Sequence, residues 1–201
     1  MKHSPRPQVV AFGPGSRLPS LDEVSTLWER HGMLDNIRAH SWVVRDVAMV
    51  LTHWLREAGH NLDARVVEVG ALLHDISKTA CLASTKRHDI EGAMLLTTLG
   101  YPELGHMVRV HVRLPRPYPV DETMIVYYAD KRVNHVQVVD LQQRYEYIIE
   151  RYGKGDPELL SLIDDSRQRA FEVEAQLFAK LLPSHCPSEL AHVVPVRTTA
   201  T

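Results

Sequence analysis

The chain has 201 residues, of which 44% are hydrophobic and 24% are charged. These values are typical of a soluble globular protein of one domain, and they exclude collagen-like, disordered and disulfide-scaffold chains. The 23 basic and 25 acidic residues give a net charge of -2, so there is no basic excess of the kind usual in proteins that bind long nucleic acids or anionic membranes.

Apolar residues recur at helical spacing from Leu21 to Leu182, and neither strict alternation nor a short hairpin turn is evident. The spacing predicts an all-α domain over residues 21–182, with flexible tails over residues 1–20 and 183–201. We expect helices at residues 21–30, 34–58, 63–76, 89–99, 103–112, from about 121 through 130, 138–152 and 156–182.

Local signals support several of these boundaries. Ser20 followed by Glu23 is a capping-box pattern at the start of the first helix. Gly59 follows the second helix, and Gly100 with Pro102 follows the fourth, which is typical of helix ends.

The remaining composition favours the cytoplasm. Cys81 and Cys186 are far apart and form no CxxC pair, so neither a redox motif nor a disulfide framework is expected. Prolines and glycines interrupt residues 1–20, where a signal peptide would need an apolar core, and no run reaches the ~18 apolar residues of a membrane span. We therefore expect a cytoplasmic protein with no membrane partner.

Twelve histidines stand against only three phenylalanines, and several turn toward the interior. By helical phase, His40, His74, His111 and Asp130 lie on the apolar faces of four separate helices, and Asp75 follows His74 directly. Taken singly, each is most simply a hydrogen-bonded core residue. Two buried aspartates with no evident basic partners, however, need a cation. Imidazole with carboxylate suits Fe, Mn, Co, Ni or Zn, with Mg also compatible, at one or two ions per chain.

The order of these residues resembles the HD superfamily of metal-dependent phosphohydrolases, named for its adjacent His-Asp pair. The stretches RAHSWVVRDVAMVL, VVEVGALLHDISKT and MIVYYADKRV are similar to its three signature segments. Two more, RHDIEGAMLLTTLGY and MVRVHVR, resemble the extra histidine segments of members that hold two metals, including the branch that hydrolyses dinucleoside tetraphosphates symmetrically. The resemblance implies a single HD-type helical bundle.

The resemblance also implies a set of metal ligands, namely His40, His74, Asp75, His88, His111 and Asp130. Within this set, His88 and His111 would complete a second metal site, and Asp75 would bridge the two metals. A surface residue at a helix start is the alternative for His88. His106 competes with His111, although its helical phase favours His111.

The implied reaction is hydrolysis of a phosphate ester or anhydride of a small nucleotide-like substrate by a metal-activated water. Asp75 would orient that water, and Lys78, one helical turn further on, would contact the phosphate. A lysine favoured by the helix dipole is the alternative for Lys78. Arg132 is a further substrate-binding candidate at the site mouth, or else a solvated surface residue. The pattern does not distinguish a monoester, a diester and a pyrophosphate.

Three alternatives stay open at this point. They are a di-iron HD-type oxygenase, a catalytically silent metal- or nucleotide-binding signalling module, and a plain helical bundle with hydrogen-bonded core histidines. The charge balance favours a small phosphorylated substrate over a long nucleic acid. The oligomeric state is left open, and a homodimer is compatible with the sequence.

Overall fold

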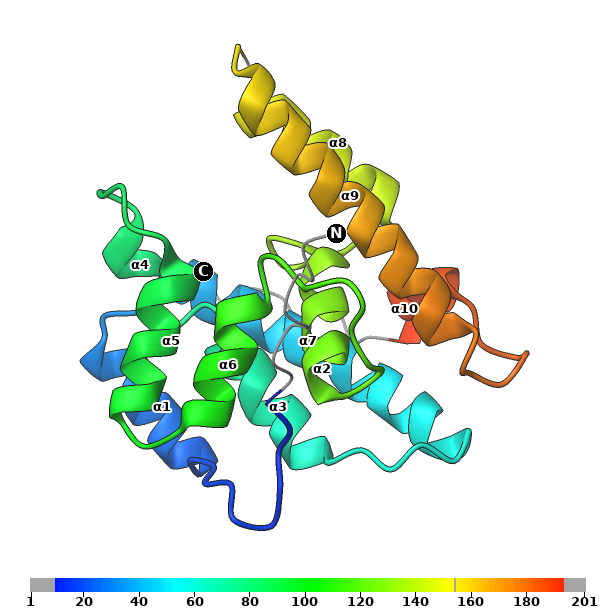
Figure 1. Ribbon diagram of the computed structural model, residues 1–201, viewed down its shortest axis with the longest axis horizontal. Coiled ribbons are helices and arrows are strands. Elements are labelled where there is room, and N and C mark those ends of the chain that lie inside the picture. The colour runs from blue at the N-terminus through cyan, green and yellow to red at the C-terminus, as the bar shows by residue number, and fades with distance from the viewer. Residues whose placement is uncertain (1–9, 154, 194–201) are drawn as a thin grey trace, which may run out of the picture.

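The computed structural model describes residues 10–153 and 155–193, which form a bundle of helices with one very small sheet (Figure 1). The helices are α1 Leu21–Arg30, α2 Asp35–Glu57, α3 Ala64–Leu73, α4 Lys78–Cys81, α5 His88–Thr98, α6 Pro102–Val110, α7 Glu122–Lys131, α8 Leu141–Tyr152, α9 Pro157–Phe178, the 3-10 helix η1 Pro187–Glu189 and α10 Leu190–Val193. The strands are β1 Val133–Asn134 and β2 Gln137–Val138. The predicted all-α class is confirmed.

Side-chain caps and glycines set the helix ends, as the sequence indicates. The Ser20 hydroxyl accepts from the Glu23 N–H at 3.1 Å and the Glu23 carboxylate accepts from the Ser20 N–H at 2.6 Å, which completes the predicted capping box of α1. Gly59 after α2 and Gly100 after α5 have φ angles of 89° and 87°. Residues with a Cβ rarely adopt this conformation, so both helices end where the sequence predicts.

Helix α3 lies at the centre of the molecule between two hydrophobic clusters. It packs against α2 and α7 on one side and against α1 and α6 on the other. Val67, Val69 and Leu72 of this helix have no exposed surface. Each such burial stabilises the fold by about 1.5–3 kcal/mol. Because α3 is enclosed, the residues that follow its last turn also lie inside the protein.

The end of α3 differs from the expected boundary. The sequence predicts a helix through residue 76, but regular helix stops at Leu73 and the chain tightens into turns. The Ile76 N–H donates to the Leu73 carbonyl at 3.1 Å and the Lys78 N–H donates to the Asp75 carbonyl at 2.9 Å, both three residues back. The His-Asp pair therefore lies on a turn rather than within a regular helix.

The unexpected sheet is an antiparallel hairpin that pairs Val133 with Val138 and Asn134 with Gln137. It takes up the start of the segment predicted as a helix from residue 138, so α8 begins at Leu141 instead. Helices α8 and α9 then lie side by side and extend away from the bundle (Figure 1).

Parts of both predicted tails cover the bundle. Phe12 and Leu18 pack against the hydrophobic clusters, and Leu190 is fully buried. The His185 ring stacks on Trp54 of α2 with ring centres 4.3 Å apart. The remainder of the predicted tails, residues 1–9 and 194–201, lies outside the described residues. None of the helices in the described part of the chain combines the length and apolar character that a bilayer crossing requires.

Candidate metal centre

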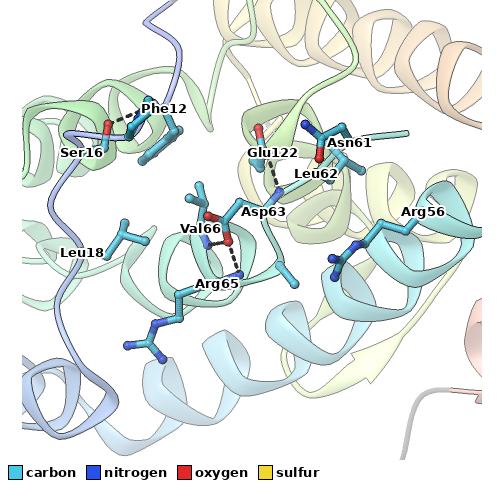
Figure 2. Close-up of a pocket in the computed structure, with 13 residues that line it drawn as sticks. Phe12, Ser16, Leu18, Arg56, Asn61, Leu62, Asp63, Arg65, Val66 and Glu122 are labelled. Atoms are coloured by element: carbon cyan, nitrogen blue, oxygen red, sulfur yellow. Dashed lines mark hydrogen bonds between the residues drawn. The ribbon is translucent and has the colours of Figure 1, made fainter. Parts of the chain in front are cut away.

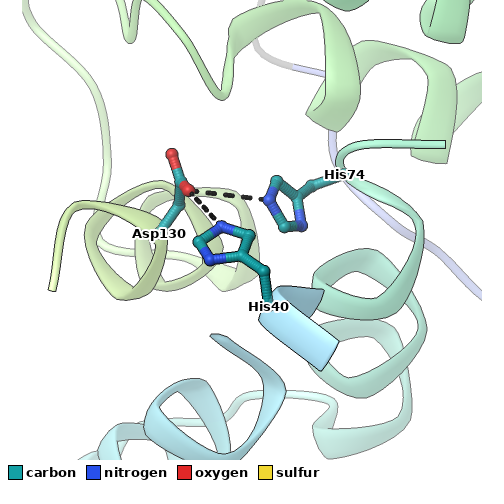
Figure 3. A group of neighbouring side chains, drawn as sticks. All are labelled: His40, His74 and Asp130. Carbon is teal, nitrogen blue, oxygen red and sulfur yellow. Dashed lines mark hydrogen bonds and ion pairs between the residues drawn. The ribbon is translucent and has the colours of Figure 1, made fainter. Parts of the chain in front are cut away.

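Three side chains from different parts of the chain meet beside the end of α3 (Figure 3). His40 comes from α2, His74 from the turn after α3 and Asp130 from the last turn of α7. The Asp130 Oδ1 lies 3.1 Å from His40 Nε2 and 3.6 Å from His74 Nε2. All three residues are buried. We call them the first group.

A second group lies beside the first and consists of Asp75, His88 and His111. The Asp75 Oδ1 is 3.3 Å from His88 Nε2 and 3.7 Å from His111 Nε2. The His88 Nε2 and the His111 Nε2 are 3.3 Å apart. His88 begins α5 and His111 follows α6, and these two helices pack closely against each other.

Asp75 connects the two groups through its two carboxylate oxygens. Its Oδ1 faces the second group, whereas its Oδ2 lies 3.4 Å from His74 Nε2 of the first. Asp75 is 1% exposed, so solvent does not satisfy this carboxylate. The side chain thus has the placement that a bridging ligand would need.

Backbone carbonyls fix the orientation of three of the histidines. The Nδ1 atoms of His40, His74 and His111 lie 2.8, 2.7 and 2.6 Å from the carbonyl oxygens of His135, Ala71 and Val108 respectively. A carbonyl only accepts hydrogen bonds, so each Nδ1 carries the proton. In the neutral ring the lone pair is then on Nε2, the atom that faces the carboxylates. This second contact is typical of histidines that bind metals.

When the rings are neutral, the centre therefore consists of hydrogen-bond acceptors that face one another. Within the described residues, His74 Nε2 and Asp75 Oδ1 are buried and have no hydrogen-bond partner. Unsatisfied buried acceptors are costly, and a cation would satisfy them. Two ligands at about 2.1 Å from one ion would lie roughly 3.0–3.4 Å apart, near the observed contacts. The donor set of imidazole and carboxylate fits transition metals.

The electrostatics show how strongly the buried carboxylates attract positive charge. Burial alone would lower the pKa of His74, but the carboxylates of Asp75 and Asp130 raise it to about 10. Burial works to raise the pKa values of Asp75 and Asp130, yet the ammonium groups of Lys78 and Lys131 respectively, together with nearby histidines, hold them well below the usual range. Without a metal, a proton on His74 would supply part of the missing charge.

His88 behaves differently from His74. Burial lowers its pKa to about 4, although Asp75 works against this shift. The ring is therefore neutral near pH 7 and has a lone pair available for a metal. The second group can thus offer two imidazoles and a carboxylate.

Two lysines contact the carboxylates from outside the groups. Lys78 Nζ lies 2.7 Å from Asp75 Oδ2, and its side chain is 38% exposed, so it lies at the boundary between the centre and solvent. Lys131 is buried, and its Nζ donates to Asp130 Oδ2 at 2.6 Å and to the His111 carbonyl at 3.1 Å. No sequence pattern marks Lys131 as a site residue, because lysines are rarely buried and adjacent residues of a helix point in different directions.

The structure gives Arg132 a different place from the expected one. Its guanidinium is buried and donates to the Val139 carbonyl at 2.7 Å, the Tyr128 hydroxyl at 2.6 Å and the Pro187 carbonyl at 2.9 Å. It therefore ties α7 to the segments that precede α8 and α10. With these donors used, Arg132 is not placed to bind a substrate at the site mouth, and that expectation is corrected.

His106 also lies apart from the centre, because its Nε2 is 3.3 Å from the Tyr118 hydroxyl instead of facing Asp75. A separate pocket lies at the opposite end of α3, lined by residues such as Phe12, Arg56 and Arg65 (Figure 2). It shares no residue with either ligand group. Ten helical residues rise about 15 Å, so this pocket is remote from His74.

The described residues thus form a helical fold that brings together two His/Asp groups with the donor atoms to hold metal ions. Residues 39–135 match the family model described as HD domain, and this segment holds all six residues of the two groups. Residues 39–135 are therefore similar to the HD-domain family, whose members are generally metal-dependent hydrolases.

Among curated proteins, the chain is similar to an uncharacterized protein of Methanocaldococcus jannaschii. The two are 26% identical over 148 residues, which cover 64% of this chain and 85% of the relative. No solved structure matches significantly.

Proposed function

We propose that this protein is a metal-dependent phosphohydrolase that cleaves a phosphate ester or anhydride of a small nucleotide-like molecule. The observation that supports the proposal is that imidazole Nε2 atoms and carboxylate oxygens lie close together in the interior. Two of these atoms, His74 Nε2 and Asp75 Oδ1, have no hydrogen-bond partner within the described residues. The first group would hold one divalent or trivalent cation and the second group another, with Asp75 shared. We assign this activity to the domain predicted over residues 21–182, and a cytoplasmic location stays a prediction.

The chain's own residues would divide the work of phosphate hydrolysis. Bound metal ions would supply Lewis acidity and lower the pKa of water to near 7. Asp75, with one oxygen toward each group, would accept a hydrogen bond from the attacking water and orient it. Lys78 would place a positive charge beside the transferred phosphoryl group, because its ammonium contacts Asp75 and its side chain reaches solvent.

The test combines metal content with turnover. The purified chain is loaded with Mn, Co, Ni, Fe, Zn or Mg, and each form is assayed against nucleotides, dinucleoside polyphosphates and simple phosphodiesters. His40→Ala should lose metal from the first group and lose turnover. His53→Ala is the matched control, since His53 lies on the same helix with 70% of its side chain exposed.

The outcomes separate the alternatives. Anaerobic turnover of a phosphate compound by the Mn or Co form would contradict an oxygenase. Bound metal without turnover of any phosphate compound would contradict the proposal and favour the oxygenase or the silent signalling module. Absence of stoichiometric metal at every loading would leave only a helical bundle with paired core histidines.

A further inference from the structure

One half-buried arginine near the first group has no carboxylate partner in the described part of the chain, in contrast to Arg45. Arg45 contacts Asp46 and Glu68 at 3.0 and 2.5 Å. Arg144 of α8 is also half-buried, but its Nη1 donates to the neutral amide oxygen of Asn134 at 3.1 Å. No carboxylate among residues 10–153 and 155–193 forms an ion pair with it, and its buried Nε has no hydrogen-bond partner there. A guanidinium in this state retains an N–H donor with which to bind an anion.

The neighbours of Arg144 place it at the edge of the candidate metal centre. Asn134 precedes His135, whose carbonyl accepts from His40 Nδ1 at 2.8 Å. Tyr147 lies one turn after Arg144 on α8, and its ring packs on His135 with centres 5.3 Å apart. This face of α8 therefore covers the hairpin that orients His40.

Lys78 supplies a second cation at the edge of the candidate metal centre. Its ammonium contacts Asp75 Oδ2 at 2.7 Å, and its side chain is 38% exposed. Two cationic side chains from separate helices, α4 and α8, therefore border the ligand groups.

We propose that Arg144 is a substrate-binding residue that, together with Lys78, binds phosphoryl oxygens of the substrate beside the first group. The planar guanidinium fork matches the spacing of phosphate oxygens and makes charge-assisted hydrogen bonds to them. This inference rests on the proposed phosphohydrolase function and extends it by naming the residue that recognises the anionic part of the substrate.

The test measures anion binding directly, so that it does not depend on turnover. Pyrophosphate is titrated calorimetrically into Mn-loaded full-length protein, and Arg144→Gln is compared with the wild type and with Arg144→Lys. Arg151→Gln is the matched control, because Arg151 lies on the same helix but is exposed and contacts Tyr152. Because Arg144→Gln would remove hydrogen bonds to a charged group, we expect the affinity for pyrophosphate to fall at least about tenfold. Arg144→Lys should retain part of the affinity, and Arg151→Gln all of it.

Two further readouts distinguish binding from a structural role. If Arg144 binds the anion, Arg144→Gln keeps the metal content and thermal midpoint of the wild type and raises KM more than it lowers kcat. Wild-type pyrophosphate affinity and KM in this variant would overturn the assignment, while the proposed function would stand if the wild type turns over phosphate compounds. If no phosphate compound is turned over but Arg144→Gln still loses pyrophosphate, the anion site holds and the proposed function fails.

Discussion

Replacing Lys131 with methionine should destabilise the metal-free protein strongly. Lys131 and Asp130 are each 7% exposed, and the mutation removes the 2.6 Å ion pair between them and the 3.1 Å bond to the His111 carbonyl. A buried ion pair that loses one partner costs about 3–5 kcal/mol, because the remaining charge stays buried. At about 2–4 °C per kcal/mol for a chain of this size, the thermal midpoint should fall by roughly 6–20 °C.

The assay is thermal unfolding after chelation, with and without added Mn. Lys86→Met is the matched control, since its ion pair with Glu91 is at the surface and the lysine side chain is 64% exposed. That variant should change stability by about 1 kcal/mol or less. Because Lys131 orients a proposed ligand, Lys131→Met should also weaken metal binding, by about 10–100-fold. A metal-free Lys131→Met protein that unfolds at the wild-type temperature would refute this reasoning.

Three further predictions follow from the same contacts. The pKa of His74 is raised from 6.5 to about 10 in the metal-free fold, so its protonation stabilises that fold fully below pH 6.5 and ceases to do so as the pH rises through 10. Metal binding near pH 7.5 should therefore release about one proton per chain, which calorimetry in buffers of different ionisation enthalpy detects; zero release would contradict it. Arg132→Met should lower the free energy of unfolding by roughly 3 kcal/mol in chemical denaturation while KM is unchanged; a raised KM at unchanged stability would restore the substrate role. Gly105→Ala should cost about 1–3 kcal/mol, because its Cβ would approach the Ala93 carbonyl oxygen to 2.8 Å; an unchanged thermal midpoint would show that α5 and α6 separate freely.

The sequence predicts the fold well because its local signals agree with one another. Apolar spacing and the Ser20–Glu23 capping box place α1 where the structure has it. Helical phase alone turns His40 and Asp130 inward, and the structure brings these two residues together across 90 positions of chain. Contacts between residues that are distant in the sequence can therefore be expected from helical phase, provided that each helix buries one face.

Other features depend on tertiary contacts that carry no local pattern. The two-residue strands are too short to show alternation, and the His135 carbonyl becomes a partner of His40 only after the hairpin has folded over α2. Arg132 and Lys131 follow Asp130 directly, and their burial is decided by acceptors on distant segments. From the sequence alone, a charged residue next to a metal ligand is therefore predicted to be exposed, and only the whole fold shows that it is buried.

The central claim is that the imidazoles and carboxylates converge because cations lie between them. Anomalous diffraction from crystals of the Mn- or Fe-loaded protein tests it most directly. We expect a peak about 2.0–2.2 Å from the Nε2 atoms of the first group, and a second between His88 and His111 when both sites fill. A fully metal-exposed crystal with no peak at either group, and with water alone between Asp75 and its histidines, would contradict the account.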